Sequence, residues 1–411
     1  MRAEIIATGS ELLTGGVLDT NSLFLSEQLL LAGIRTAFKT AVGDDEKDME
    51  EAVRNACERT DVVIITGGIG PTEDDITRKV TAKIMKKRLV LNEDALKAIH
   101  GKLAGRSRDI IAANDRQALI PSGSRLLPNP AGIAPGFYID EGKPFLAVLP
   151  GVPAEMRAMF TEHLRPVLLD RFASKTFVRR RKLRTLGMSE SAVNGAIQDI
   201  MRRGTVSIGM TAIDRGVDVR ILAEAARTEQ AQTLLDTAEK ALREKLGDAV
   251  YGIDGQELEE VVGALLSQRR LRLSVAESCT GGLIGARITN ISGSSGYFER
   301  GAVVYSNEAK TEMLGVPAAL IGQYGAVSQE VAAAMAQGIR DSARTDLGLA
   351  VTGIAGPGGG TGQKPVGLVF IALATPSGVL SAEHRFMGNR DDVRMRASQM
   401  ALDMVRRYLI G

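Results

Sequence analysis

The two residues best suited to nucleophilic catalysis in this chain are a serine, Ser278, and a lysine, Lys310. Ser278 lies in SVAESCTGG, where a predicted strand passes into a predicted helix through two glycines. A hydroxyl on such a turn faces the positive end of the helix dipole. Lys310 ends the motif YSNEAK. It can take the serine proton only if burial or a neighbouring cation lowers its pKa well below the ordinary value of about 10.4.

Two other groups compete for these roles. The thiol of Cys279 is the rival nucleophile, because thiols are intrinsically more reactive. Neighbouring residues on a tight turn point in different directions, and we expect Ser278 to be the one that reaches the substrate. None of the three histidines lies beside a glycine-rich or nucleophile-bearing loop. Catalysis by a serine activated by histidine is therefore not favoured.

Backbone amides beside the serine form the predicted oxyanion hole. The N–H groups of Thr280, Gly281 and Gly282 follow Ser278 at the start of a helix predicted for residues 282–289. Donors in this position stabilise the negative charge that develops in acyl transfer.

A second constellation suits phosphate. In TGGIGPTEDDIT, the glycines let backbone N–H groups approach an anion, and a helix predicted to begin near Asp75 points its positive end there. Asp74 and Asp75, with Asp44 from a neighbouring loop, offer oxygen ligands to a divalent metal that bridges phosphates. In the alternative interpretation Asp75 caps its helix and Asp44 lies in a solvated turn.

Strands and helices alternate over the first 170 residues, with strand-like runs at 4–8, 61–66 and 145–149. The helical runs between and around them are 21–32, 48–59, 75–87 and 154–164. This alternation predicts parallel βαβ units in a doubly wound α/β sheet. Ligands of such sheets bind beyond the carboxyl ends of the strands, where the glycine-rich turns fall.

Residues 171–252 predict a small α+β module. A basic run from Arg179 to Lys182 precedes a helix near 189–202, two strands joined at the turn 213–216, and a helix over 229–246. The order is KH-like, but no GxxG loop separates the helices. A spacer or dimer-forming domain is therefore favoured over an RNA-binding one.

Residues 253–411 return to an α/β pattern. Strands are predicted at 271–276, 301–305, 347–352, 367–374 and 380–386, with helices at 256–270, 329–342 and 391–409. The glycine-rich stretch GIAGPGGGTGQKPVG, from Gly353, falls between two strands, and such loops usually cover a site.

Composition narrows the function classes. The chain has 51 Lys and Arg against 49 Asp and Glu, which gives a net charge of +2. Such a small net charge does not produce an overall positive potential that would attract nucleic acid. Tryptophan is absent and no apolar run approaches the roughly 20 residues of a membrane span. The opening MRAEIIATGS is typical of a strand and not of a signal peptide, and two cysteines in unrelated contexts argue against disulfides. We expect a cytoplasmic protein without membrane or nucleic-acid partners.

The C-terminal motifs AESCTGG, GSSGYFERGAVVYSNEAK, YGAVS, TGIAGPGGG, KPVG and GNRDDVR resemble the C-terminal domain of the CinA family of competence/damage-inducible proteins. That domain is similar to nicotinamide-nucleotide amidases, which are Ser/Lys hydrolases without a cofactor. The resemblance implies that Ser278 is the nucleophile, Lys310 the base, Tyr305 a residue that orients the pair, and Arg390 a phosphate ligand. The loops Gly353-Ile354-Ala355-Gly356 and Ser294-Ser295 would border the pocket. Asn389 stands where the family has an acidic residue, which would leave Arg390 less tethered.

The N-terminal motifs GGIGPTEDDIT, ATGSELLTGG and LPGVPAEM resemble the molybdopterin-binding-type domain, and more closely its variant in CinA proteins. That variant is associated with metal-dependent cleavage of ADP-ribose, which implies a divalent ion (Mg, Mn or Co) and K⁺. Pyrophosphate and metal would be held by Asp44 and by Gly68, Gly70, Pro71, Thr72, Asp74 and Asp75. The nucleoside side would be lined by Asn129, Gly132 and Gly136.

The expected protein is thus a homodimeric, bifunctional enzyme of pyridine-nucleotide salvage. Its domain 253–411 would deamidate nicotinamide mononucleotide, and its domain 1–170 would cleave ADP-ribose. Two alternatives stay open at this point. One is a molybdopterin-processing N-terminal domain with an inactive partner domain, and the other is a non-enzymatic accessory protein of DNA uptake or repair.

Overall fold

The computed structural model describes residues 1–172, 176–213 and 216–411, so Asp214 and Arg215 of the predicted turn lie outside the described residues. Internal contacts divide the chain into two units, residues 1–179 with 223–233 and residues 180–222 with 234–411. Within the described ranges, no helix has both the length and the apolar character that a bilayer span requires.

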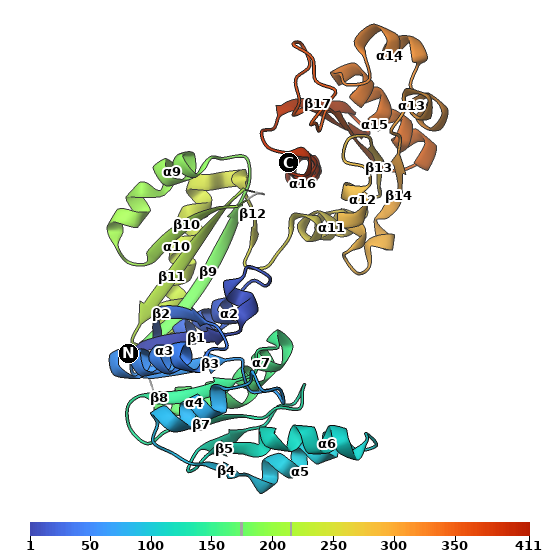
Figure 1. Cartoon of the computed structure of the whole chain (residues 1–411). Coiled ribbons are helices and arrows are strands. Elements are labelled where there is room, and N and C mark those ends of the chain that lie inside the picture. Colours follow the sequence, from blue (N-terminus) through green and yellow to red (C-terminus); the bar gives the residue numbers. More distant parts are fainter. Residues whose placement is uncertain (173–175, 214–215) are drawn as a thin grey trace. The chain divides into compact units, whose positions relative to one another are not determined.

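A six-stranded sheet of order β2-β1-β3-β8-β7-β6 organises the first unit (Figure 1). The parallel strands are β1 (Arg2–Thr8), β2 (Arg35–Val42), β3 (Val62–Thr66) and β8 (Phe145–Leu149). The antiparallel strands are β7 (Gly136–Ile139) and β6 (Arg125–Leu127). The predicted parallel core is therefore extended by two antiparallel strands at one edge.

Helices cover both faces of this sheet. Because side chains alternate along a strand, Ile5 joins the core beneath α2 (Thr20–Leu31) and α7 (Pro153–Met159). Ile6 joins the opposite core, beneath α3 (Glu46–Arg59) and α4 (Thr77–Ile84). The doubly wound prediction is confirmed. The remaining elements are α1 (Ser10–Leu13), β4 (Leu89–Leu91), α5 (Glu93–Lys102), α6 (Arg108–Asp115), η1 (Arg116–Ala118), β5 (Leu119–Pro121), η2 (Phe160–Leu164) and α8 (Arg165–Arg171).

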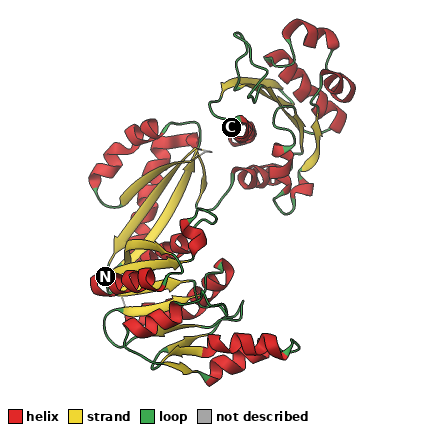
Figure 2. Cartoon of the chain, viewed as in Figure 1, coloured by secondary structure: helices red, strands yellow, loops and turns green. Residues whose placement is uncertain are grey.

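A small four-stranded sheet, of order β10-β11-β9-β12, belongs mostly to the second unit. Its strands are β9 (Phe177–Thr185), β10 (Ser207–Ile213), β11 (Gly216–Ala225) and β12 (Val250–Ile253). They alternate with α9 (Glu190–Arg203), α10 (Thr228–Leu246) and η3 (Gly247–Ala249), as the colours of Figure 2 show. This is the α+β pattern expected for this part of the chain.

The five-stranded sheet of the second unit has the order β14-β13-β15-β16-β17. Its parallel strands are β13 (Leu273–Glu277), β14 (Phe298–Val303) and β15 (Leu347–Gly353), and β16 (Leu368–Thr375) and β17 (Gly378–Arg385) are antiparallel. One face packs on α11 (Leu258–Arg269), α12 (Leu283–Thr289) and α16 (Arg390–Ile410). The other packs on α13 (Asn307–Leu314), α14 (Ala318–Tyr324) and α15 (Gln329–Ala343). A short η4 (Ser294–Gly296) precedes β14.

A buried polar network joins the three helices on the first of these faces. The Nη2 atom of Arg287, on α12, lies 2.7 Å from Glu259 Oε2 on α11 and donates to Gln399 Oε1 on α16 at 2.6 Å. Its Nη1 atom donates to Ser398 Oγ at 2.8 Å. All four residues are buried. Because α12 follows the Ser278 turn, the network fixes the helix that leads out of that turn.

We expect Arg287→Met to lower the stability of the second unit by about 3–5 kcal/mol, because the substitution breaks the buried Arg287–Glu259 ion pair while the Glu259 carboxylate stays in the core. The measurement is hydrogen exchange of peptides from α11 and α12 as a function of urea. Arg272→Met is the matched control, since it removes the more exposed Arg272–Glu299 pair and should cost no more than about 1 kcal/mol. Equal losses in the two variants would contradict this account.

Candidate functional sites

The carboxyl ends of β13, β14 and β15 meet at one edge of the five-stranded sheet. In the parallel register Glu277 pairs with Val303 on one side and with Val351 on the other. Ser278 therefore follows β13 at the same level as the end of β14 and the Gly353 end of β15. This places three predicted site segments side by side.

Lys310 reaches this edge from α13. The helix is N-capped by Ser306, whose hydroxyl accepts from Ala309 N at 3.0 Å. Side chains on a helix lean toward its N-terminus, so Lys310 points back at the strand end. Its Nζ atom lies 3.2 Å from Ser278 Oγ.

Main-chain carbonyls surround the rest of the Lys310 ammonium. Nζ donates to the carbonyl oxygens of Val304 at 2.9 Å, Tyr305 at 3.1 Å and Ser306 at 3.3 Å. Lys310 is 1% exposed, and burial lowers its pKa from the ordinary value, although the neighbouring Cys279 and Glu308 act in the opposite direction. Burial thus favours the neutral amine, the form that accepts a proton.

The thiol of Cys279 is enclosed. It is 5% exposed, and burial raises its pKa to about 12. It therefore stays protonated at neutral pH, whereas a nucleophilic cysteine needs a thiolate. The chemistry of the turn accordingly favours Ser278, which has the Lys310 amine within reach.

The amides beside the serine are arranged differently from the expectation. The Glu277 carboxylate is buried and accepts from Gly282 N at 3.0 Å, Ile284 N at 3.1 Å and Gly285 N at 2.8 Å. Gly281 N donates to Ser278 O at 3.1 Å. Two of the three predicted oxyanion donors, Gly281 and Gly282, are therefore committed to the turn itself.

Thr280 keeps the predicted position for an oxyanion donor. Among the described residues its N–H has no acceptor, and its buried Oγ1 has no hydrogen-bond partner either. Its carbonyl is held by Arg394, whose Nη2 donates to it at 3.0 Å. Arg394 and Glu277 were missed in the sequence, although an acidic residue directly before the nucleophile was a signal for a carboxylate that organises the turn.

Arg390 is firmly held, in spite of the Asn389 substitution in the motif. Asn389 caps α16 by accepting from Asp391 N at 2.8 Å, and Asp392 accepts from Asn389 N in return. The Nη1 atom of Arg390 donates to Gly356 O at 2.8 Å and its Nη2 atom to Tyr305 Oη at 2.9 Å. The predicted loosening of Arg390 is thus not seen.

Tyr305 contacts both groups through different atoms. Its main-chain carbonyl accepts from Lys310, while its phenol, on a residue 60% exposed, binds Arg390. The side chain was expected to orient the serine–lysine pair, and the structure places it on the arginine instead.

The two loops predicted to border the pocket lie at opposite ends of the parallel strands. Gly353 ends β15 at the Ser278 edge and Ile354, Ala355 and Gly356 follow it, with Ile354 N donating to Leu368 O at 2.9 Å. Ser294 and Ser295 lie in η4, before β14, and β14 begins opposite Leu273, the first residue of β13. Their placement at the Ser278 pocket was wrong for a single chain, because a parallel register sets them at the other end of the strand.

The N-terminal loops enclose a cavity of about 880 Å³ in the first unit. Of the predicted residues, those that line it are Asp44, Gly68, Gly70, Pro71, Thr72, Asp74, Asp75 and Gly132. Asn129 is buried, 5% exposed, beneath the loop that carries Gly132. Gly136 lies within β7, where a side chain would overlap the main chain of Val148, so its glycine serves sheet packing.

The carboxylates of this cavity do not form a ready metal site. Asp44 Oδ2 accepts from Ser10 N at 2.9 Å and Ser10 Oγ at 2.8 Å, and Asp75 Oδ2 accepts from Thr72 N at 2.8 Å and Thr72 Oγ at 2.6 Å. These hydrogen bonds stabilise the turns in which Asp44 and Asp75 lie. The alternative role of Asp75 as a helix cap is not seen either, because α4 begins at Thr77 without a cap from Asp75. No group of three or more potential ligands for a metal occurs in the part of the chain that the structure describes. The residues present therefore do not fit a metal held by protein alone.

Two arginine side chains donate hydrogen bonds to main-chain carbonyls of the glycine loop. Arg78, 4% exposed, donates through Nη2 to Gly70 O at 2.8 Å and through Nη1 to Ile69 O. Arg116 Nη1 donates to Pro71 O at 3.1 Å. Burial lowers the pKa of Arg78 to about 10, so the group remains charged at neutral pH. The loop thus has a fixed positive charge beside it, which favours an anion.

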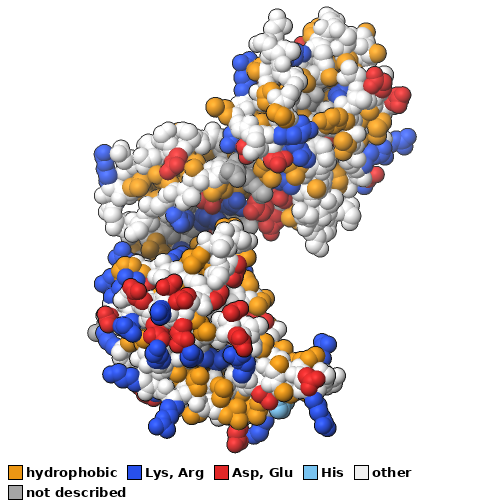
Figure 3. Space-filling view, viewed as in Figure 1, with side chains coloured by type: hydrophobic (Ala, Val, Ile, Leu, Met, Phe, Trp, Pro, Cys, Tyr) orange, Lys and Arg blue, Asp and Glu red, His pale blue; other side chains and the backbone are white. Residues whose placement is uncertain are grey.

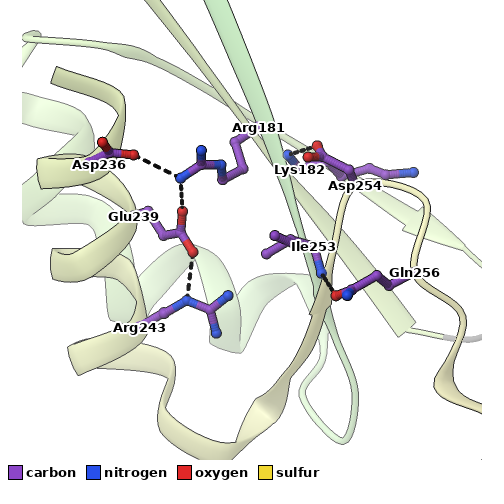
Figure 4. A network of polar contacts seen from close by, with 8 residues as sticks. All are labelled: Arg181, Lys182, Asp236, Glu239, Arg243, Ile253, Asp254 and Gln256. Atoms are coloured by element: carbon purple, nitrogen blue, oxygen red, sulfur yellow. Dashed lines mark hydrogen bonds and ion pairs between the residues drawn. The ribbon is translucent and has the colours of Figure 1, made fainter. Parts of the chain in front are cut away.

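Two residues of the basic run in the middle segment, Arg181 and Lys182, pair with acidic side chains. Arg181 Nη1 lies 2.9 Å from Asp236 Oδ1 and also pairs with Glu239, as Figure 4 shows. Lys182 Nζ lies 3.2 Å from Asp218 Oδ2, while its main-chain N–H donates to Asp254. Acidic and basic side chains are also intermixed on the visible surface (Figure 3). The positive charges of Arg181 and Lys182 are therefore offset by neighbouring carboxylates.

Three segments of the chain match protein families. Residues 4–170 match the family described as "Probable molybdopterin binding domain". Residues 180–252 match "Damage-inducible protein CinA KH domain", and residues 255–409 match "CinA C-terminal domain".

The chain is 42% identical over 411 residues to a "CinA-like protein" of Geobacter sulfurreducens, covering 100% of both chains. It is 42% identical over 412 residues to a "CinA-like protein" of Dictyoglomus thermophilum, again covering 100% of both. A solved structure of the competence/damage inducible protein CihA from Agrobacterium tumefaciens is 42% identical over 38% of this chain and 94% of that one, with a TM-score of 0.37. From its full-length relatives and its three family matches, the chain belongs to the CinA family, with a molybdopterin-binding-like N-terminal segment.

Proposed function

We propose that the C-terminal site is a Ser/Lys amidohydrolase that releases ammonia from nicotinamide mononucleotide. The observation that carries the proposal is the 3.2 Å separation of Lys310 Nζ from Ser278 Oγ in a setting that lowers the pKa of the lysine. A hydroxyl beside a neutral amine can become a nucleophile without histidine. The substrate comes from the resemblance of this domain to nicotinamide-nucleotide amidases.

In the first half of the reaction, Ser278 Oγ attacks the carboxamide carbon as its proton passes to the neutral Lys310 amine. The Thr280 N–H is the donor available to the resulting oxyanion. Lys310 then returns the proton to the amide nitrogen, the C–N bond breaks, and ammonia leaves an acyl-serine.

In the second half, Lys310 takes a proton from a water molecule that attacks the acyl carbon. The ester bond to Ser278 breaks, the proton returns to Oγ, and nicotinic acid mononucleotide is released. Arg390 has two of its five N–H donors committed, to Gly356 and Tyr305, and offers the remaining ones to the substrate phosphate.

For the N-terminal cavity we propose ADP-ribose cleavage as a second activity. Its volume of about 880 Å³ lies within the range of small-molecule sites. The glycine loop supported by Arg78 suits a pyrophosphate. Because the described carboxylates do not hold a metal alone, the divalent ion remains an implication of the resemblance. The test is hydrolysis of ADP-ribose against molybdopterin-adenylate, with Mg²⁺, Mn²⁺ or Co²⁺ added. Turnover of the adenylate alone would contradict the proposal.

Ser278→Ala and Lys310→Arg should each reduce ammonia release by roughly 10³-fold or more, because the nucleophile or its neighbouring base is lost. Arginine keeps the charge but cannot deprotonate. Cys279→Ala is the control and should retain turnover, since the thiol is buried and protonated. The measurement is ammonia release from nicotinamide mononucleotide without added metal. Loss of activity in the Cys279 variant with retention in Ser278→Ala would reverse the assignment.

The dependence of activity on pH should show that Lys310 acts as a general base. Lys310 must be neutral to act, and its pKa lies below the ordinary value because of burial. The value of kcat/KM should therefore rise as the pH rises through the lowered pKa of Lys310, and fall on its acidic side as the amine becomes protonated. The measurement is kcat/KM as a function of pH for the wild type. An activity that falls as pH rises through this range would rule out a lysine base.

Tyr305→Phe should raise KM more than it lowers kcat. The phenol bonds Arg390, whereas Lys310 is held by the main-chain carbonyl that the substitution leaves in place. The acidic limb of the kcat/KM profile should stay where it is in the wild type. A displaced limb would show that the phenol acts on the serine–lysine pair.

A further inference from the structure

Glu155, in the first turn of α7, lines the same cavity as the glycine loop. Its Oε2 atom accepts from Asn129 Nδ2 at 2.7 Å. Asn129 is itself fixed, because its Oδ1 accepts from Ala131 N at 3.1 Å and Gly132 N at 2.7 Å, and its Nδ2 also donates to Ala134 O at 2.9 Å. The orientation of the Glu155 carboxylate at the cavity wall is thus set before any ligand arrives.

Gly132 makes room for this carboxylate. A side chain at Gly132 would overlap the carboxyl group of Glu155, so the glycine lets the carboxylate lie directly over the loop. Lys102 Nζ donates to the main-chain oxygens of Asn129 and Gly132 and holds the same loop from α5. Asn129 thus holds the carboxylate directly, Gly132 leaves space for it, and Lys102 fixes the loop that carries them both.

The free oxygen of Glu155 suits a neutral donor. Among the described residues, none donates to Oε1. A cation there would share the loop with the Lys102 ammonium, which donates to the main-chain oxygens of Asn129 and Gly132 and disfavours a second positive charge. A hydroxyl group has no such penalty, and a carboxylate is an acceptor with several lone-pair positions.

Two other carboxylates of the cavity, those of Asp44 and Asp75, differ from Glu155 in this respect. Asp44 and Asp75 already accept from a hydroxyl and an amide of their own turns. Elsewhere on the same wall, the glycine loop with Arg78 beside it favours an anion. The cavity thus offers an anion-binding loop together with a hydroxyl acceptor, which is the pattern that a phosphorylated sugar matches.

We propose that Glu155 binds a sugar hydroxyl of the phosphorylated ligand in this cavity, with Asn129 as its positioning residue. The proposal rests on the nucleotide-binding role proposed above and goes beyond it, because it names the group that distinguishes a ribosyl ligand from phosphate alone. A carboxylate that bonds ribose hydroxyls supplies specificity because a ligand without them leaves it unpaired.

The test compares Glu155→Gln with wild type by calorimetric titration of the full chain, using ADP-ribose and inorganic pyrophosphate as probes. The variant should bind ADP-ribose roughly 10- to 100-fold more weakly, because a hydrogen bond to a charged acceptor is lost. Its affinity for pyrophosphate should stay within about twofold of wild type. Glu162→Gln, an exposed residue of η2 in the same helical stretch, is the matched control and should leave both affinities unchanged.

Each outcome decides the matter. ADP-ribose affinity that survives in Glu155→Gln overturns the inference, and so does an equal loss for pyrophosphate, which would assign Glu155 to the anion. A wild type that binds neither probe also overturns it. Glu155-dependent binding of ADP-ribose without its hydrolysis supports the inference while removing the proposed activity, so the two claims fail separately.

Discussion

The C-terminal site depends on the burial of one ammonium group. Lys310 is 1% exposed, and a charged group taken out of water needs hydrogen-bond partners inside the protein. The segment between β14 and α13 provides them as the main-chain carbonyls of Val304, Tyr305 and Ser306. This segment is held by Val304 N, which donates to Glu277 O at 2.8 Å. The strand pairing, the Ser306 cap and the position of Ser278 are all needed to place this amine.

The two candidate sites use the same feature of α/β sheets in different ways. Both lie beyond the carboxyl ends of parallel strands, where consecutive loops converge. In the second unit this produces a close contact between two side chains. In the first unit it produces an open cavity whose loops are held by Asp44, Asp75 and Arg78, and whose lining includes the carboxylate of Glu155.

Sequence patterns were sufficient for the alternation of strands and helices, and for the serine and lysine that flank β14. They could not show which amide groups near Ser278 are free, because the reach of Glu277 across the turn exists only in three dimensions. Ser294 and Ser295 precede β14 in sequence, yet the parallel register decides which end of the sheet they occupy. No sequence motif pointed to Arg78, because its role of supporting the glycine loop depends on a buried contact with the loop's main chain.

The Glu277 carboxylate has a consequence for the flexibility of the nucleophile turn. It binds three amides that would otherwise be free at the start of α12. The conformational entropy of these residues is therefore lost when the chain folds and not when a ligand binds. A ligand that enters meets a preorganised turn, so that more of its interaction energy appears as affinity or as lowered activation barrier.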